Sequence, residues 1–196
     1  MAADAEYGEH LKKLFTPVMT GVGPVEASIS LTRALVEAKA AGSPPDLVVS
    51  LGSAGSRRLK RTEVYQAVSV TYRDMNASAF GFEKGVTPFL DLPATQPLPI
   101  RIPGVKEATI STGATIIAGP AFDGIGEDMV DMETYACLRV CQAFGVPLVG
   151  LRGISDGDTD VDHIKDWLEY LHIVDEKLAD AVQKLEAGIA NGTIRI

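Results

Sequence analysis

Two carboxylates each follow an apolar run within residues 128–158. Glu133 closes a short run that begins at Met129, and Asp156 closes the longer run Leu148–Ile154. A charged group at the end of a buried strand is costly unless it has a partner or a function. The pair therefore marks a candidate ligand site, and the plainer alternative is that either acid only caps a helix or lies in a loop.

The segment between these acids predicts a strand, a helix and a second strand. Apolar residues recur with helical spacing from Thr134 to Phe144, and Gly145 breaks the helix before the second apolar run. A helical crossover joins parallel strands. We therefore expect a parallel pair with both acids at the carboxyl ends, the edge at which open α/β sheets bind ligands.

The N-terminal quarter adds two further candidates for a ligand site, the acid Glu6 and one glycine-rich turn. Glu6 lies at the entry to a short predicted helix, Tyr7–Lys13, where solvated acids are common. The turn Gly21–Pro24 stands between a candidate strand, Phe15–Thr20, and a helix that runs to about Ala41. Free backbone N–H groups in such a turn suit an anion or a hydroxyl-rich ligand, but the turn lacks the fingerprint of a dinucleotide site or a P-loop.

Small residues follow the predicted buried strand Asp46–Leu51. The expected turn Gly52–Ser56 lets a ligand approach the backbone closely, and Ser53 offers a hydroxyl there. A plain turn without function is the alternative for this segment alone.

The remaining pattern predicts a single α/β domain over residues 1–196. Strands are expected at Glu63–Tyr72 and Glu107–Ser111, and the irregular stretch Arg73–Pro99 is typical of a lid or a subunit contact. A long amphipathic helix is expected from about Lys165 to Ala187. Its core-facing apolar stripe comprises Trp167, Leu168, Leu171, Val174, Leu178, Ala181, Val182 and Leu185.

Composition narrows the class of protein. The chain has 196 residues, 46% of them hydrophobic and 22% charged, as is usual for a folded domain. Its net charge of −8 argues against nucleic acid or an anionic membrane surface as the main partner. Cys137 and Cys141, the only two cysteines, stand one helical turn apart and do not suggest a disulfide scaffold. No histidines accompany them at ligand spacing, which argues against a zinc site. With no long apolar run and no signal-peptide pattern, we expect a cytoplasmic protein.

Five short pieces resemble one enzyme family. SLGSAGS, ASAFGFEKG, TGATII, VDMETYA and LRGISDG occur in this order, and the chain from Thr20 to Leu185 resembles the 5′-methylthioadenosine/S-adenosylhomocysteine nucleosidases of the nucleoside phosphorylase superfamily. VDMETYA followed by RGISD is typical of the superfamily, while AFGFEKG and Glu6 favour the nucleosidase branch. The resemblance implies a mixed, largely parallel β-sheet flanked by helices, a homodimer, no metal and no organic cofactor. It also implies hydrolysis of an adenine nucleoside to adenine and a thioribose product.

The resemblance also implies roles for the two acids of the central stretch. Asp156 matches the acid that lets adenine leave neutral, with Ser155 orienting it. Such an acid needs a raised pKa to hold a proton near neutral pH. Glu133 matches the carboxylate that accepts hydrogen bonds from the ribose hydroxyls, and Met132 would pack under the ribose.

The other implied roles fall on earlier segments. Glu6 matches the general base that activates water, supported by Ser53 and Arg152, although Arg152 could equally form a structural ion pair. Ile116 and Ile117 match the turn that holds adenine. Two aromatic residues of the irregular stretch, Phe80 and Phe82, would close the 5′-substituent pocket, in part across the dimer interface.

The chain departs from the family pattern in several places, among them the following two. A family strand usually precedes the position of Glu6, and only five residues do so here, so we expect that first strand to be missing or truncated. Ile116 replaces the aromatic residue that many relatives place over adenine. Two alternatives stay open: a phosphate-dependent purine nucleoside phosphorylase, which needs an anion site near Gly21, and a non-catalytic nucleoside-binding protein.

Overall fold

The protein folds around one mixed sheet, seen in a computed structural model that describes residues 1–157 and 167–196. The strand order is β3-β2-β4-β5-β1-β6, and β2 also pairs with β6, so the sheet curls back on itself. The longest ladders, β1 with β6 and β2 with β4, are parallel, whereas β3 and β6 pair with β2 in the antiparallel sense. The strands are β1 (Val48–Gly55), β2 (Val64–Tyr72), β3 (Thr95–Pro97), β4 (Lys106–Thr112), β5 (Met129–Asp131) and β6 (Leu148–Asp156).

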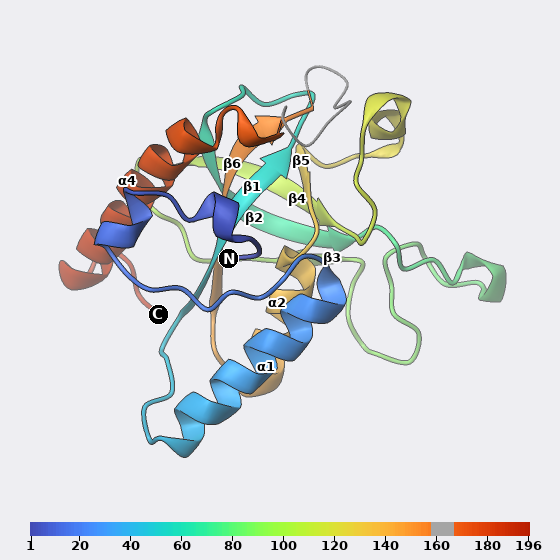
Figure 1. Ribbon diagram of the computed structural model, residues 1–196. Coiled ribbons are helices and arrows are strands. Elements are labelled where there is room, and N and C mark those ends of the chain that lie inside the picture. Colours follow the sequence, from blue (N-terminus) through green and yellow to red (C-terminus); the bar gives the residue numbers. More distant parts are fainter. Residues whose placement is uncertain (158–166) are drawn as a thin grey trace.

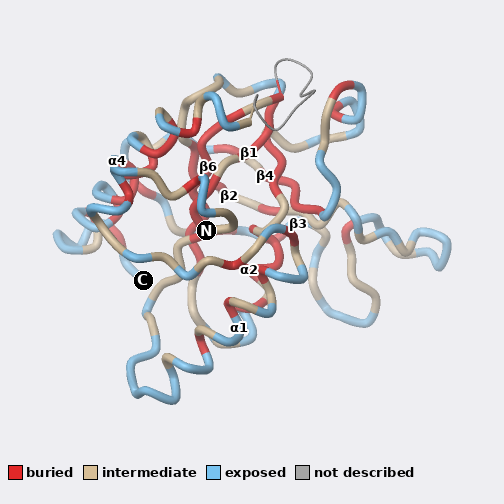
Figure 2. The backbone as a smooth tube through the Cα atoms, in the orientation of Figure 1, coloured by how far each residue is buried: buried red, intermediate tan, exposed pale blue. Residues whose placement is uncertain are grey.

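Helices cover both faces of this sheet. Helices α1 (Pro24–Ala40) and α2 (Thr134–Phe144) pack against each other on one side, and α4 (Leu171–Ala190) packs against β6 and β2 on the other (Figure 1). Alternate residues of β6 enter opposite apolar clusters: Leu148 joins that of α1 and α2, and Val149 joins that of α4. Figure 2 shows the strands as the buried centre and the outer sides of the helices as exposed. The expected mixed α/β fold is therefore confirmed.

Local periodicity predicted the regular elements well. The helix Thr134–Phe144 is confirmed with its predicted bounds, and α1 and β2 differ from their predicted bounds by about one residue. Between Arg73 and Pro99, the short strand β3 and a single 3₁₀ turn interrupt the expected irregular chain. The predicted start of the last helix at Lys165 lies outside the described residues. Helix α4 itself begins at Leu171, so Trp167 lies before it.

The predictions for the N-terminal segment were wrong. In place of the helix Tyr7–Lys13 there are two 3₁₀ turns, Asp4–Glu6 and Leu11–Lys13, and Phe15–Thr20 forms no strand. The carboxylate of Asp175 in α4 accepts backbone N–H bonds from Gly8, His10 and Leu11, which holds this segment as a loop. A partner this distant in the sequence leaves no local pattern.

The predicted parallel pair around α2 was also wrong. Strand β1 lies between β5 and β6, and it pairs in parallel with β6 but meets β5 in an antiparallel bridge at Gly55 and Val130. The expected turn Gly52–Ser56 is mostly strand, because the ladder of β1 with β6 continues to the pair Gly55 and Asp156. The small residues of this segment therefore sit inside the sheet.

A cavity of about 520 Å³ runs along β1 between α1 and α4. Its walls are largely apolar and include Leu31, Leu35 and Val182 together with residues 47–52. Glu6, Glu133 and Arg152 also line it. Within the described residues, no helix has the length and apolar character needed to cross a membrane.

Candidate active site

Glu6 is buried, with 7% of its surface exposed, and is held against strand β1. Its Oε1 atom accepts hydrogen bonds from the backbone N–H and from the hydroxyl of Ser53, both at 2.7 Å. A Cβ atom at Gly52 would lie only 3.0 Å from the same oxygen, so the glycine makes room for the carboxylate. The position of Glu6 at a predicted helix start suggested a solvated acid, but its contacts make it part of an internal site.

Glu133 joins the start of α2 to the start of α1. Its Oε1 atom accepts the backbone N–H of Gly23 at 2.8 Å, so the glycine turn before α1 binds a carboxylate of the protein itself. Burial, followed by the negative charge of Asp131, raises the pKa of Glu133 to about 7, although the Gly23 bond and Arg152 oppose this shift. Glu133 thus changes charge near neutral pH.

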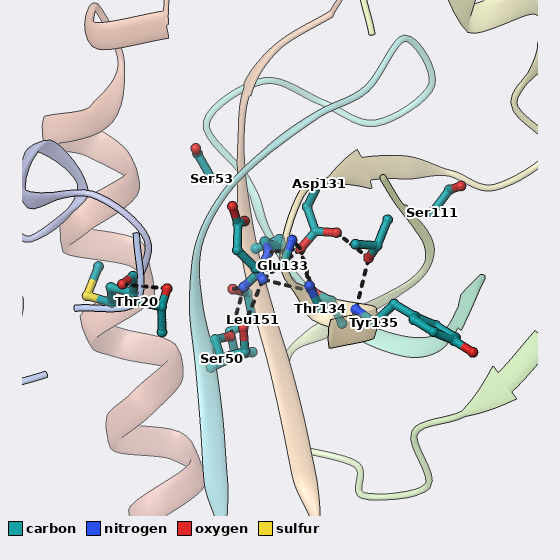
Figure 3. A network of polar contacts seen from close by, with 12 residues as sticks. Thr20, Ser50, Ser53, Ser111, Asp131, Glu133, Thr134, Tyr135 and Leu151 are labelled. Atoms are coloured by element: carbon teal, nitrogen blue, oxygen red, sulfur yellow. Dashed lines mark hydrogen bonds and ion pairs between the residues drawn. The ribbon is translucent and has the colours of Figure 1, made fainter. Parts of the chain in front are cut away.

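A buried ion pair lies near this acid, and Figure 3 shows one of its members, Asp131, close to Glu133. The Nη2 atom of Arg152 is 2.8 Å from Oδ2 of Asp131, and each side chain is at most 2% exposed. Asp131 also accepts bonds from the hydroxyls of Thr112 and Thr134. Burial alone would raise the pKa of Asp131, but the charge of Arg152 and these bonds outweigh it, so the pKa is lowered.

The guanidinium of Arg152 is fully engaged with Asp131 and the residues around it, which together we call the frame. Its remaining hydrogen bonds go to the carbonyl and hydroxyl of Ser50, the carbonyl of Leu151 and the hydroxyl of Thr134. Of the two roles left open for Arg152, the structure supplies the ion pair, while its charge still faces the cavity shared with Glu6 and Glu133. Sequence reasoning missed Asp131 as the partner, for which the only signal was an acid two residues before Glu133.

Asp156 ends strand β6 beside Gly55 of β1. A Cβ atom at Gly55 would lie 3.0 Å from Oδ2 of Asp156, so this glycine too makes room for a carboxylate. The buried hydroxyl of Ser155 donates to Oδ1. Burial raises the pKa of Asp156, against the Ser155 bond and the charge of Arg61.

Strand β1 thus connects the two ends of the candidate site. Glu6 contacts it at Ser53 and Asp156 at Gly55, and positions two residues apart in a strand lie roughly 7 Å from each other. Glu6 and Glu133 both line the cavity, and Ser53 holds the carboxylate of Glu6. Asp156 lies one step further along β1 and is not among the residues that line this cavity.

The residues predicted to hold the base and the 5′-substituent lie on more open segments. Ile116 is 72% and Phe80 is 85% exposed, while Ile117 is half-buried. Phe82 packs edge-on against Phe89 in the segment that protrudes from the body in Figure 1. Met132 is half-buried between Asp131 and Glu133. These positions are open enough for contact with a ligand or a second subunit.

Trp167 is a residue of the site that sequence reasoning missed. The helical spacing suggested a place in the core-facing stripe of the last helix, but its indole Nε1 atom donates to the hydroxyl of Ser53 at 2.8 Å. The two residues are separated by 114 positions, so no local pattern could have indicated the contact.

Comparison with known proteins identifies the family. Residues 5–187 match the model of the phosphorylase superfamily. The 5′-methylthioadenosine/S-adenosylhomocysteine nucleosidase of Baumannia cicadellinicola is 31% identical over 175 residues, which cover 79% of this chain and 72% of the relative. That of Actinobacillus succinogenes is 33% identical over 169 residues, which cover 76% and 70%. The chain belongs to the phosphorylase superfamily and, within it, to the family of these nucleosidases.

Solved structures agree on the fold. Futalosine hydrolase of Helicobacter pylori superimposes with a TM-score of 0.75 at 20% identity, covering 95% of this chain and 94% of that one. The 5′-methylthioadenosine/S-adenosylhomocysteine nucleosidase of the same organism, solved with butyl-thio-DADMe-Immucillin-A, gives a TM-score of 0.75 at 21% identity, covering 95% of each chain. At this level of identity the comparison supports the architecture alone.

Proposed function

We propose that this protein hydrolyses the N-glycosidic bond of 5′-methylthioadenosine, S-adenosylhomocysteine or both, releasing adenine and a thioribose product. The observation that carries the proposal is the contact of Glu6 and Asp156 with positions 53 and 55 of β1, while Glu133 lines the same cavity as Glu6. Such a reaction needs a base for water, an acid for the purine and a carboxylate at the sugar. The nucleosidase relatives supply the substrate class.

Asp156 is the proposed acid. Glycosidic cleavage builds negative charge on the departing adenine, and a proton delivered to N7 of the base removes it. The raised pKa of Asp156 keeps a larger share of its carboxyl group protonated near neutral pH. Ser155 holds one carboxyl oxygen and so directs the other towards the purine.

Glu133 is the proposed ribose ligand. Gly23 engages Oε1, which leaves Oε2 for the 2′- and 3′-hydroxyls of the sugar. A charge-assisted hydrogen bond of this kind is strong, and a nearby anion favours the positive charge that develops on the ribose. Met132 would pack under the sugar ring, as the family resemblance implies.

Glu6 is the proposed general base. Both donors from Ser53 converge on Oε1, so Oε2 is the oxygen placed to accept a proton from the attacking water. Arg152 would support this end of the cavity through its charge. Ile116 and Ile117 would hold adenine, and the exposed aromatic residues of the protruding segment, Phe80 and Phe82, would close over the 5′-substituent.

The carboxylate of Glu133, which lies at the N-terminus of α1, favours hydrolysis over phosphorolysis. The N–H of Gly23, which would suit a phosphate oxygen, already binds the Glu133 carboxylate. A phosphate at this place would face a like charge. We expect adenine and thioribose, detected by mass spectrometry, to form at the same rate with and without phosphate. Activity that requires phosphate would overturn the hydrolase, and binding without turnover would indicate a nucleoside-binding protein.

A homodimer is proposed from the surface of α1. Val25, Ile29 and Val36 of α1 recur at helical spacing, Val22 lies just before the helix, and each of the four is about half exposed or more. Exposed apolar side chains gathered on one helix are typical of a protein interface. Sedimentation should show a dimer that Val25→Glu weakens. A wild-type monomer would contradict this assembly. The free, buried thiols of Cys137 and Cys141 support a reducing, cytoplasmic location.

A further inference from the structure

The single tryptophan of the chain, Trp167, donates a hydrogen bond to a residue that holds the proposed general base. Its Nε1 atom lies 2.8 Å from the hydroxyl oxygen of Ser53, which lies 2.7 Å from Oε1 of Glu6. The three side chains come from three distant segments: the N-terminal 3₁₀ turn, strand β1 and the chain just before α4.

The chemistry of the three groups gives this chain of bonds one direction. An indole N–H only donates, a hydroxyl donates one proton and accepts others, and an ionised carboxylate only accepts. When Trp167 donates to the Ser53 oxygen, the hydroxyl proton of Ser53 is left to point at Glu6. Without that donor the hydroxyl could rotate towards other acceptors or water, and Glu6 would lose part of its anchoring.

Burial does not force this contact. Trp167 is half-buried, so water could reach an indole N–H that had no protein partner. Because solvent could satisfy the indole N–H, its bond to Ser53 is not needed to bury a polar group. We read the bond instead as one that orients Ser53 and, through it, Glu6. In a network that ends on a carboxylate, each bond polarises the next.

We propose that Trp167 is a positioning residue that acts through Ser53 to orient the carboxylate of Glu6. With Oε1 fixed by two Ser53 donors, Oε2 is left to face the attacking water. The one hydrogen bond that Oε2 accepts in the described residues is long, 3.4 Å from the backbone nitrogen of Ala3. This inference rests on the proposed function, because it concerns the residue assigned there as the base.

The first test is a double-mutant cycle with Trp167→Phe and Ser53→Ala. Phenylalanine keeps an aromatic ring and removes only the N–H donor. We expect Trp167→Phe to lower kcat on methylthioadenosine by about three- to tenfold, the scale of one hydrogen bond, with KM changed less than kcat. In the Ser53→Ala background the same substitution should cause little further loss. Leu168→Ala, at the exposed neighbouring position, is the control and should match the wild type.

The second test does not depend on turnover. Because the chain has one tryptophan, its ¹⁵N-labelled form gives a single indole N–H signal. We expect this signal to exchange slowly with solvent in the wild type and to shift and exchange faster in Ser53→Ala. This measurement decides the contact even if Trp167→Phe fails to fold.

Two results would overturn the proposal. One is an indole signal that does not respond to Ser53→Ala, and the other is a loss from Trp167→Phe that is equally large with and without the Ser53 hydroxyl. A wild-type protein that cleaves neither nucleoside would instead reject the proposed function, while the indole signal would still report on the contact with Ser53.

Discussion

Asp131 and Glu133 stand two positions apart, yet their surroundings differ in one decisive respect. Both carboxylates lie near Arg152. Asp131 is bonded on both oxygens by Arg152, Thr112 and Thr134, whereas Glu133 accepts one backbone N–H, that of Gly23. The pKa of Asp131 is lowered, and that of Glu133 is raised to about 7. Burial raises the pKa of both acids, and the charge of Arg152 together with the extra hydrogen-bond donors outweighs it only at Asp131.

This difference suggests that the two acids have different roles, one structural and one in ligand binding. A carboxylate with every oxygen bonded is part of a rigid frame, because moving it would break several bonds at once. A carboxylate with one free oxygen is available to a ligand. Asp131 therefore holds the start of α2 in place through the backbone N–H of Thr134, and we propose that it positions Glu133 for the sugar. Asp156, with Ser155 on one oxygen and a raised pKa, belongs with Glu133.

The largest expected effect tests whether Asp156 belongs to the partly bonded class. Asp156→Asn preserves the shape of the side chain and removes the transferable proton. Turnover of methylthioadenosine should fall by about two to four decades, the scale of a lost general acid, while the circular dichroism spectrum stays that of the wild type. An Asn variant with full activity would reject the assignment of Asp156 as the acid.

A second prediction tests Asp131 as part of the frame. Asp131→Asn leaves the guanidinium of Arg152 buried without its counter-charge, which should lower the free energy of unfolding by about 3–5 kcal/mol. Asp180→Asn is a suitable control, because it breaks an exposed ion pair with Lys184 and should cost less than about 1 kcal/mol. Denaturant unfolding measures both variants. Equal losses would show that burial of the Asp131 pair carries no special weight.

The sequence predicted the elements of this site better than their arrangement. Helix α2 and strand β2 follow from the spacing of their own residues, which is a local property. The order β5-β1-β6 does not, because the crossover rule cannot tell whether another strand lies between the two it joins. The Asp131–Arg152 pair and the contact of Trp167 with Ser53 also depend on distant partners.

The acids show the same limit. Glu133 and Asp156 were visible because each closes an apolar run. Glu6 looked like an ordinary surface acid until the family resemblance singled it out, and its bonds to Ser53 join positions 47 residues apart. Residue type and position along a strand mark an acid as a candidate, but only its three-dimensional partners decide between frame and ligand.

The smallest effect is also the sharpest test of the comparison, because the two acids should respond to pH with opposite sign. The pKa of Glu133 rises from 4.5 to about 7 on folding. Its protonated form thus favours the fold below pH 4.5, and that contribution is lost as the pH rises through 7. The pKa of Asp131 is lowered, so its contribution is present at neutral pH and is lost in acid.

Glu133→Gln should therefore become progressively more stable than the wild type as the pH rises from about 4.5 to 7, by on the order of 2–3 kcal/mol at most. Its activity should follow the opposite course. If Glu133 is the ribose ligand as proposed, its ionised form accepts the ribose hydroxyls, so wild-type kcat/KM should increase as the pH rises through about 7. Glu133→Gln should be slower and should lack this increase. Paired unfolding and rate measurements from pH 5 to 8 check both halves. A Gln variant that loses stability throughout this range would place Glu133 in the frame with Asp131.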